Sequence, residues 1–169
     1  MAHFQRGMAA KDGQPMDGET ADLLFGLGRA QMAVLEGTRL QGAADSFLRV
    51  FGYAIQVGET RRAVVIATFR YPTAPYMRGL AEMFRRALQL VPTDSLEAGY
   101  LLANYALWIY YETGDVDESK DSYQRALALA QDHGDDALEL HTESRHLQML
   151  GHSESGPEVY EGALSTGIR

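Results

Sequence analysis

The stretch that decides the fold is GDVDESKDSYQRALALA, residues 114–130, which reappears in outline as GHSESGPEVYEGAL at residues 151–164. The two copies share an aromatic residue that is followed three positions later by a small one. This frame occurs five times at spacings of 37 to 43 residues, beginning at Phe4, Phe47, Phe84, Tyr123 and Tyr160. Residues three apart lie on one face of a helix, and a small side chain there lets a neighbouring helix approach closely. The copies are therefore predicted to be the second helices of helical hairpins.

A further helical pattern is predicted ahead of each of the later copies. Apolar residues recur there at the spacing of one helix face, for example at Leu102, Tyr105, Ala106 and Ile109. The predicted first helices span 19–36, 60–71, 95–113 and 136–150. No segment has the pattern of a strand, so the chain is predicted to be all-α.

The connections between these helices are only a few residues long, so consecutive helices should pack antiparallel. Glycines stand where helices should end, and Pro72 and Pro75 should interrupt the chain within the pair that begins near residue 59. We predict a single helical-repeat domain over 1–169. In it, 1–18 is the second helix of an upstream repeat plus a linker, and the successive pairs span 19–58, 59–93, 94–133 and 134–169.

Charge and composition exclude several classes of protein. The 169 residues carry a formal net charge of −8, which makes nucleic-acid binding unlikely over most of the surface. Cysteine is absent and no apolar run approaches the roughly 20 residues of a membrane span, so a protein of the cytoplasm is expected.

The charge is also unevenly placed. Residues 111–169 carry thirteen acidic and four basic side chains, whereas 61–93 carry six arginines and only one acidic residue, Glu82. The basic segment could be a solvated face, a surface that complements a neighbouring repeat, or a docking patch for an acidic partner.

The repeats resemble the tetratricopeptide repeat family. The resemblance is carried by LFGLGRAQ at 24–31, FRRALQLVP at 84–92, WIYYETGD at 108–115 and YQRAL at 123–127. It implies a right-handed solenoid of antiparallel helix pairs whose first helices line a concave, partner-binding surface. The carboxylate clamp of that family needs Lys and Asn at set positions, and only Asn104 is in keeping with it.

The degenerate repeats of 37 to 40 residues are similar to one subfamily, the helical-repeat regions of large ATP-dependent LuxR-type transcriptional regulators. This resemblance implies a sensor or scaffold portion of a longer polypeptide. The opening HFQRGM and the closing STGIR both fall within predicted repeats, which agrees with an excised piece. A free-standing repeat adapter is the alternative.

Motifs that could carry chemistry are weak. Gly26 and Gly28 begin a dinucleotide-like loop, but Gln31 stands in place of the third glycine. The acidic run that starts at Asp115 has Lys120 at the glycine position of a calcium loop, so we interpret it as a helix N-terminus. His141 and His146 are five residues apart and share no helix face as a metal pair would. We predict no cofactor, no metal and no catalytic residue, and an all-helical enzyme is the weaker hypothesis.

Binding of a protein or peptide is the predicted function. The groove positions implied by the resemblance mix aromatic residues with arginines, the types enriched at binding hot spots. They are Phe25, Arg29, Arg62, Val65, Phe69, Asn104, Trp108, Tyr111, His141 and Arg145. Alternatively, Phe69, Trp108 and Tyr111 are core residues packed between repeats. Apolar faces around Phe4 and Met8 and around Tyr160 and Leu164 could instead pair two copies into a homodimer.

Overall fold

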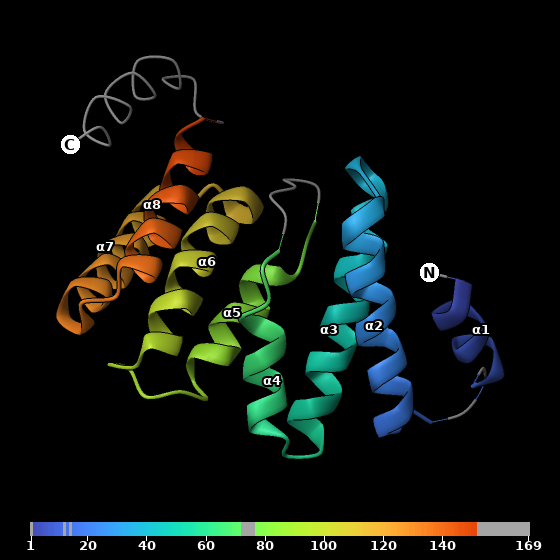
Figure 1. The fold of residues 1–169 in the computed structure, drawn as a ribbon. Coiled ribbons are helices and arrows are strands. Elements are labelled where there is room, and N and C mark those ends of the chain that lie inside the picture. The colour runs from blue at the N-terminus through green and yellow to red at the C-terminus, as the bar shows by residue number, and fades with distance from the viewer. Residues whose placement is uncertain (1, 12, 14, 72–76, 152–169) are drawn as a thin grey trace. The chain divides into compact units, whose positions relative to one another are not determined.

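The computed structural model describes residues 2–11, 13, 15–71 and 77–151, and these residues form helices joined by turns, with no strand among them (Figure 1). The all-α prediction is confirmed. The chain divides into two compact units, Met1–Leu90 and Val91–Arg169. Among the described helices, none combines the length and the apolar character needed to cross a bilayer.

The described part of the first unit contains five α-helices and a short 3-10 turn. The helices are α1 (Ala2–Ala10), α2 (Gly18–Val34), α3 (Leu40–Gln56), α4 (Thr60–Ala67) and α5 (Leu80–Leu88), with the turn at Gly37–Arg39. The second unit contains α6 (Leu96–Thr113), α7 (Val116–His133) and α8 (Asp136–Leu150). The repeat frame therefore lies on helices α1, α3, α5 and α7, as predicted, while its copy at Tyr160 and the residues Pro72 and Pro75 lie outside the described residues.

Side-chain caps fix where several helices begin. Asp17, Ser95, Asp115 and Asp135 each accept a hydrogen bond from the backbone N–H three residues later, which satisfies a donor that the first helical turn leaves unpaired. The acidic run at Asp115 is thus the N-terminus of α7, as interpreted from the sequence. Gly114 and Gly134 end α6 and α7 with φ of 74° and 61°, a conformation that favours glycine.

In the first unit, glycines allow helices to approach closely. Gly26 lies against the ring of Phe4, which joins α1 to α2, and Gly28 lies against the ring of Phe47, which joins α2 to α3. Gly26 and Gly28 are therefore packing positions inside a helix and form no phosphate-binding loop. Phe4 is half-buried, while Tyr160 and Leu164 of the other predicted dimerisation face lie outside the described residues.

Helix α4 is shorter than predicted, because it ends at Ala67 and not near residue 71. The hydroxyl of Thr68 donates to the carbonyl of Val64, and the hydroxyl of Tyr71 donates 2.8 Å back to the carbonyl of Ile66. Such side-chain bonds compete with the helical ladder, and the residue before a proline disfavours the helical conformation. Tyr71 is consequently folded inward and is 2% exposed, and this burial raises the pKa of its hydroxyl.

In the second unit, α6 packs against both α7 and α8. Every residue from Leu101 to Trp108 is buried, so α6 is enclosed around its whole circumference. The hydroxyl of Ser119, in the first turn of α7, donates 2.7 Å to the carbonyl of Ala106, which ties α7 to α6.

Two glycine-to-alanine substitutions should have opposite effects on stability. A Cβ at Gly99 in α6 would collide with Cδ2 of Leu138, which is fully buried and has little room to move, whereas a Cβ at Gly52 in α3 meets no described atom within 4 Å. We expect Gly99→Ala to cost about 1–3 kcal/mol of unfolding free energy. Gly52→Ala should instead stabilise the chain by about 0.5–1 kcal/mol through the higher helix propensity of alanine. Urea unfolding of the two variants measures both, and an equal gain in stability at the two positions would contradict the close packing of α6 on α8.

Candidate functional site

The predicted groove residues fall into two sets, and each set is brought together within one unit. The first set lies on or just after α2 and α4 and consists of Phe25, Arg29, Arg62, Val65 and Phe69. The second set lies on α6 and α8 and consists of Asn104, Trp108, Tyr111, His141 and Arg145.

An aromatic cluster forms the floor of the first set. Phe25 and Phe69 meet edge to face with their ring centroids 6.2 Å apart, and both also contact Phe47, at 5.5 Å and 5.0 Å. The guanidinium of Arg29 lies 5.9 Å from the Phe25 ring and 6.0 Å from the Phe69 ring, within range of cation–π attraction. Phe47 is fully buried, while Arg29 is exposed, so the cluster runs from the core to the surface.

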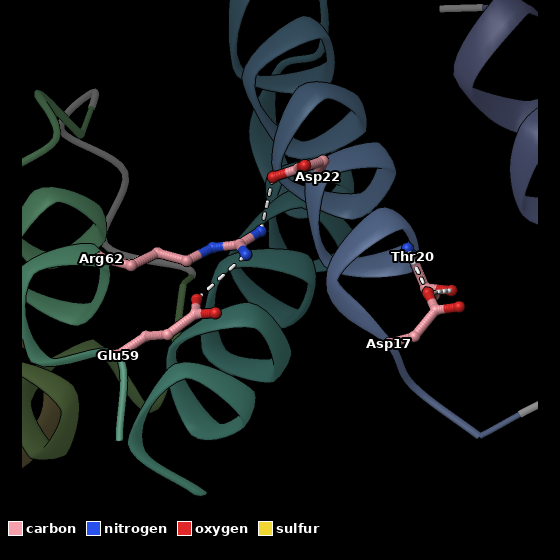
Figure 2. A network of polar contacts seen from close by, with 5 residues as sticks. All are labelled: Asp17, Thr20, Asp22, Glu59 and Arg62. Atoms are coloured by element: carbon pink, nitrogen blue, oxygen red, sulfur yellow. Dashed lines mark hydrogen bonds and ion pairs between the residues drawn. The ribbon is translucent and has the colours of Figure 1, made fainter. Parts of the chain in front are cut away.

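A polar bridge spans α2 and α4 beside this cluster. Arg62 donates to Asp22 of α2 at 2.6 Å and to Glu59, just before α4, at 3.2 Å (Figure 2). The same view shows Asp17 capping Thr20 at the N-terminus of α2, where the hydrogen bonds of Thr20 and Lys11 lower the pKa of the Asp17 carboxyl. Arg62 therefore pairs with both carboxylates of this region and offsets one of their two negative charges.

A groove with a volume of about 730 Å³ opens between these elements, and we call it the α2–α4 groove. Val65, at 53% exposed, presents an apolar side chain to it. Arg61 is also exposed in the groove and, like Arg29, has no carboxylate partner among the described residues. The lining residues are Asp22, Phe25, Gly58, Glu59, Thr60, Arg61, Arg62, Val65 and Ile66.

The sequence did not indicate the roles of Asp22 and Glu59, whereas Arg61 belongs to the basic segment 61–93 for which a docking patch was one interpretation. Asp22 and Arg62 are 40 residues apart, close to one repeat, so opposite charges at the repeat spacing were the available signal. Asp22 and Glu59 are recognisable as one polar group only in the folded structure, where Arg62 bonds to both.

The second set corrects the prediction for three residues. Asn104 is 2% exposed, Trp108 is 0% exposed and Arg145 is 6% exposed, so none of them presents a surface to a partner. The alternative of a core residue holds for Trp108, whose ring meets that of Tyr111 edge to face at 5.9 Å.

The polar members of the second set form a structural network between α6 and α8. The Nε of Arg145 donates 3.1 Å to Oδ1 of Asn104, which also accepts from His141 at 3.3 Å. Arg145 donates further to Gln148, and the hydroxyl of Tyr111 donates to the Gln148 carbonyl. These bonds satisfy polar groups that burial would otherwise leave costly. A cavity of about 10 Å³ beside Arg145 and His146 holds at most one water molecule.

His146 should make the second unit sensitive to acid. Its ring stacks on Tyr123 at 4.1 Å, and its Nδ1 has no hydrogen-bond partner among the described residues. Burial, with a smaller contribution from Lys120, lowers the pKa of His146 below 6.5, although Glu143 opposes this. As the pH falls below 6.5, the unfolded chain therefore takes up a proton before the folded one does, and stability declines until the pH passes the folded pKa.

The substitution His146→Phe keeps a ring on Tyr123 and removes the titration. We expect the unfolding free energy of this variant to depend less on pH than that of the wild type between pH 7 and pH 5. Urea unfolding across this range measures the difference, and identical pH profiles would contradict the burial of His146.

Within 2–11, 13, 15–71 and 77–151, no three His, Asp or Glu side chains lie close enough to hold a metal ion. His141 is engaged with Asn104 and with the Tyr100 ring. Comparisons of the chain with known protein families, with characterised proteins and with solved structures found no match. The α2–α4 groove is therefore the candidate site on its geometry alone.

Proposed function

We propose that the chain is a non-catalytic binding module whose α2–α4 groove receives a segment of a partner protein. The observation that carries this proposal is the exposed apolar Val65 in a groove of about 730 Å³ that also includes Phe25, the member of the aromatic–arginine cluster that lines it. Aromatic and arginine side chains are the types that dominate binding energy at protein interfaces.

The charge around the groove favours an acidic partner segment. Arg29 and Arg61 are exposed without carboxylate partners among the described residues, while Asp22 and Glu59 are already held by Arg62. An incoming Asp or Glu side chain would thus meet unpaired guanidinium groups, and the bidentate pairs that arginine makes with carboxylates would fix its position. An apolar side chain of the same segment would cover Val65.

The wider architecture we propose is a right-handed tetratricopeptide-like solenoid within a larger regulator of the LuxR type, acting in the cytoplasm. Its support is the order of packing inside each unit: α3 contacts both α2 and α4, and α8 contacts both α6 and α7. Each helix thus packs on its neighbours along the chain, as in repeat proteins. The resemblance of LFGLGRAQ and FRRALQLVP to tetratricopeptide repeats supports the same proposal.

A display library of random dodecapeptides tests the proposed binding. We expect the immobilised chain to select peptides enriched in Asp and Glu together with an aromatic or aliphatic residue. Selection of peptides rich in Lys and Arg would contradict the proposal, and so would enrichment no greater than that on a blank surface.

Matched variants assign the binding to the groove. Val65→Glu should weaken the selected peptides by at least about tenfold, since it places a charge in the apolar contact and repels their carboxylates. The control is Leu140→Glu on α8, where the exposed leucine is 73% accessible and lies outside the groove. Equal affinity of the two variants would exclude the α2–α4 groove as the site.

A further inference from the structure

A second concave surface lies in the first unit, and it shares no residue with the α2–α4 groove. Its volume is about 730 Å³, and it lies open between the segment before α2, the second half of α3, and α5. This size falls within the range of small-molecule sites, about 300–1,000 Å³.

Two arginines reach this pocket from equivalent positions of the repeat. Arg49 follows Phe47 by two residues on α3, and Arg86 follows Phe84 by two residues on α5. Because α3 packs against α5, the repeat brings both guanidinium groups to one pocket.

No ion pair within 4 Å joins either arginine to a carboxylate among the described residues, although Arg86 is close enough to Glu82 to help lower the pKa of that carboxyl. Arg86 lies 5.5 Å from the centroid of the buried Phe51 ring. Such stacking fixes a guanidinium while leaving its N–H groups free to donate.

The rest of the lining is mostly uncharged. Met16 and Val57 supply apolar walls, and Tyr53 supplies a hydroxyl. Asp17 is the acidic residue of the lining; its carboxylate accepts from Thr20 and is paired at 3.1 Å with Lys11, which also pairs with Glu19. Because two arginines face one aspartate, the net charge of the lining is positive.

We propose that this pocket binds a small amphiphilic anion, a phosphate or carboxylate attached to an apolar group, with Arg49 and Arg86 holding the anionic end. Two arginines can donate several charge-assisted hydrogen bonds to one phosphate or carboxylate. Met16 and Val57 would cover the apolar end. This site makes the chain responsive to a metabolite independently of the protein partner proposed for the groove.

Phenyl phosphate is the probe, titrated into the full ¹⁵N-labelled chain, with inorganic phosphate and phenol as its two separate halves. We expect phenyl phosphate to shift the amide resonances of Gly52 and Tyr53 and to bind at least about tenfold more tightly than either half. Absence of these shifts overturns the proposal, and equal binding of inorganic phosphate overturns the apolar part of the site.

Four variants locate the anionic end. Arg49→Gln and Arg86→Gln should each weaken phenyl phosphate by about tenfold or more, and Arg49→Lys, which keeps the charge but loses the planar fork, should lie between. Arg39→Gln, an exposed arginine outside the pocket, is the control and should bind as the wild type does. Arg49 is itself exposed, so its loss should leave the fold intact, and wild-type affinity of Arg49→Gln would overturn the assignment. Val65→Glu should not affect phenyl phosphate, which separates this site from the groove.

Discussion

Replacing Trp108 with alanine is expected to lower the unfolding free energy by about 3–5 kcal/mol. Trp108 is the largest of the fully buried side chains, and it lies in the stretch of α6 where every residue is buried. Its removal leaves a cavity and takes away the edge-to-face contact with Tyr111, through which it is connected to α8. Chemical denaturation followed by far-UV circular dichroism measures the loss.

The variant Trp108→Phe separates the volume of the side chain from its polarity. The indole N–H has no acceptor among the described residues, so phenylalanine removes an unsatisfied donor while it keeps a ring in the core. We expect a loss of about 1–2 kcal/mol, well below that of alanine. At a temperature where the Trp108→Ala variant is still folded, the affinity of this variant for groove-binding peptides should equal that of the wild type.

If the Trp108→Ala variant kept its stability but lost peptide binding, Trp108 would be a partner-binding residue and not a core residue.

Replacing Phe47 with alanine should have an effect of similar size, about 3–5 kcal/mol, in the first unit. Phe47 is fully buried and contacts three other rings, those of Phe25, Phe69 and Tyr71, at centroid distances of 5.0 to 5.5 Å. Its loss removes the floor beneath the groove as well as its own burial, so peptide affinity should fall together with stability.

The control for Phe47 is leucine, which retains most of the buried volume. Phe47→Leu should cost less than half as much as alanine and leave most of the peptide affinity. Thermal unfolding and fluorescence anisotropy of a labelled peptide from the library measure the two quantities. If Phe47→Ala destabilised the protein while the folded fraction bound peptide normally, the aromatic cluster would be separate from the binding surface.

Helices could be predicted from the sequence because their determinants are local. The predicted range 136–150 is α8 itself, and 19–36 and 95–113 differ from α2 and α6 by no more than two residues at either end. Apolar spacing, an acidic or hydroxyl cap such as Asp135 or Ser95, and glycine at the helix end are all visible in a short window of sequence. Helix α4 was predicted too long, since it ends at Ala67 and the hydroxyls of Thr68 and Tyr71 bond back to carbonyls four and five residues earlier.

The burial of individual groove residues could not be predicted in this way. Helical spacing shows which residues share a face of one helix with Phe25, Arg62, Asn104 or Trp108. It does not show whether a neighbouring helix covers that face. Which face is covered depends on how closely neighbouring helices approach, and this differs between the units. Helices α6 and α8 are in close contact and enclose Asn104, whereas Arg62 has to span from α4 to Asp22 on α2, so the groove there remains open.

Methyl chemical-shift mapping can locate an acidic peptide bound in the α2–α4 groove. The chain carries several exposed valines of similar accessibility, Val34 at 60%, Val57 at 47% and Val65 at 53%, and of these only Val65 lines the groove. On addition of a peptide selected from the library, we expect the methyl resonances of Val65 and its neighbour Ile66 to shift while those of Val34 and Val57 do not. If the methyl resonances of Val34 or Val57 shifted while that of Val65 did not, the peptide would bind elsewhere, and the proposal that it occupies the α2–α4 groove would be wrong.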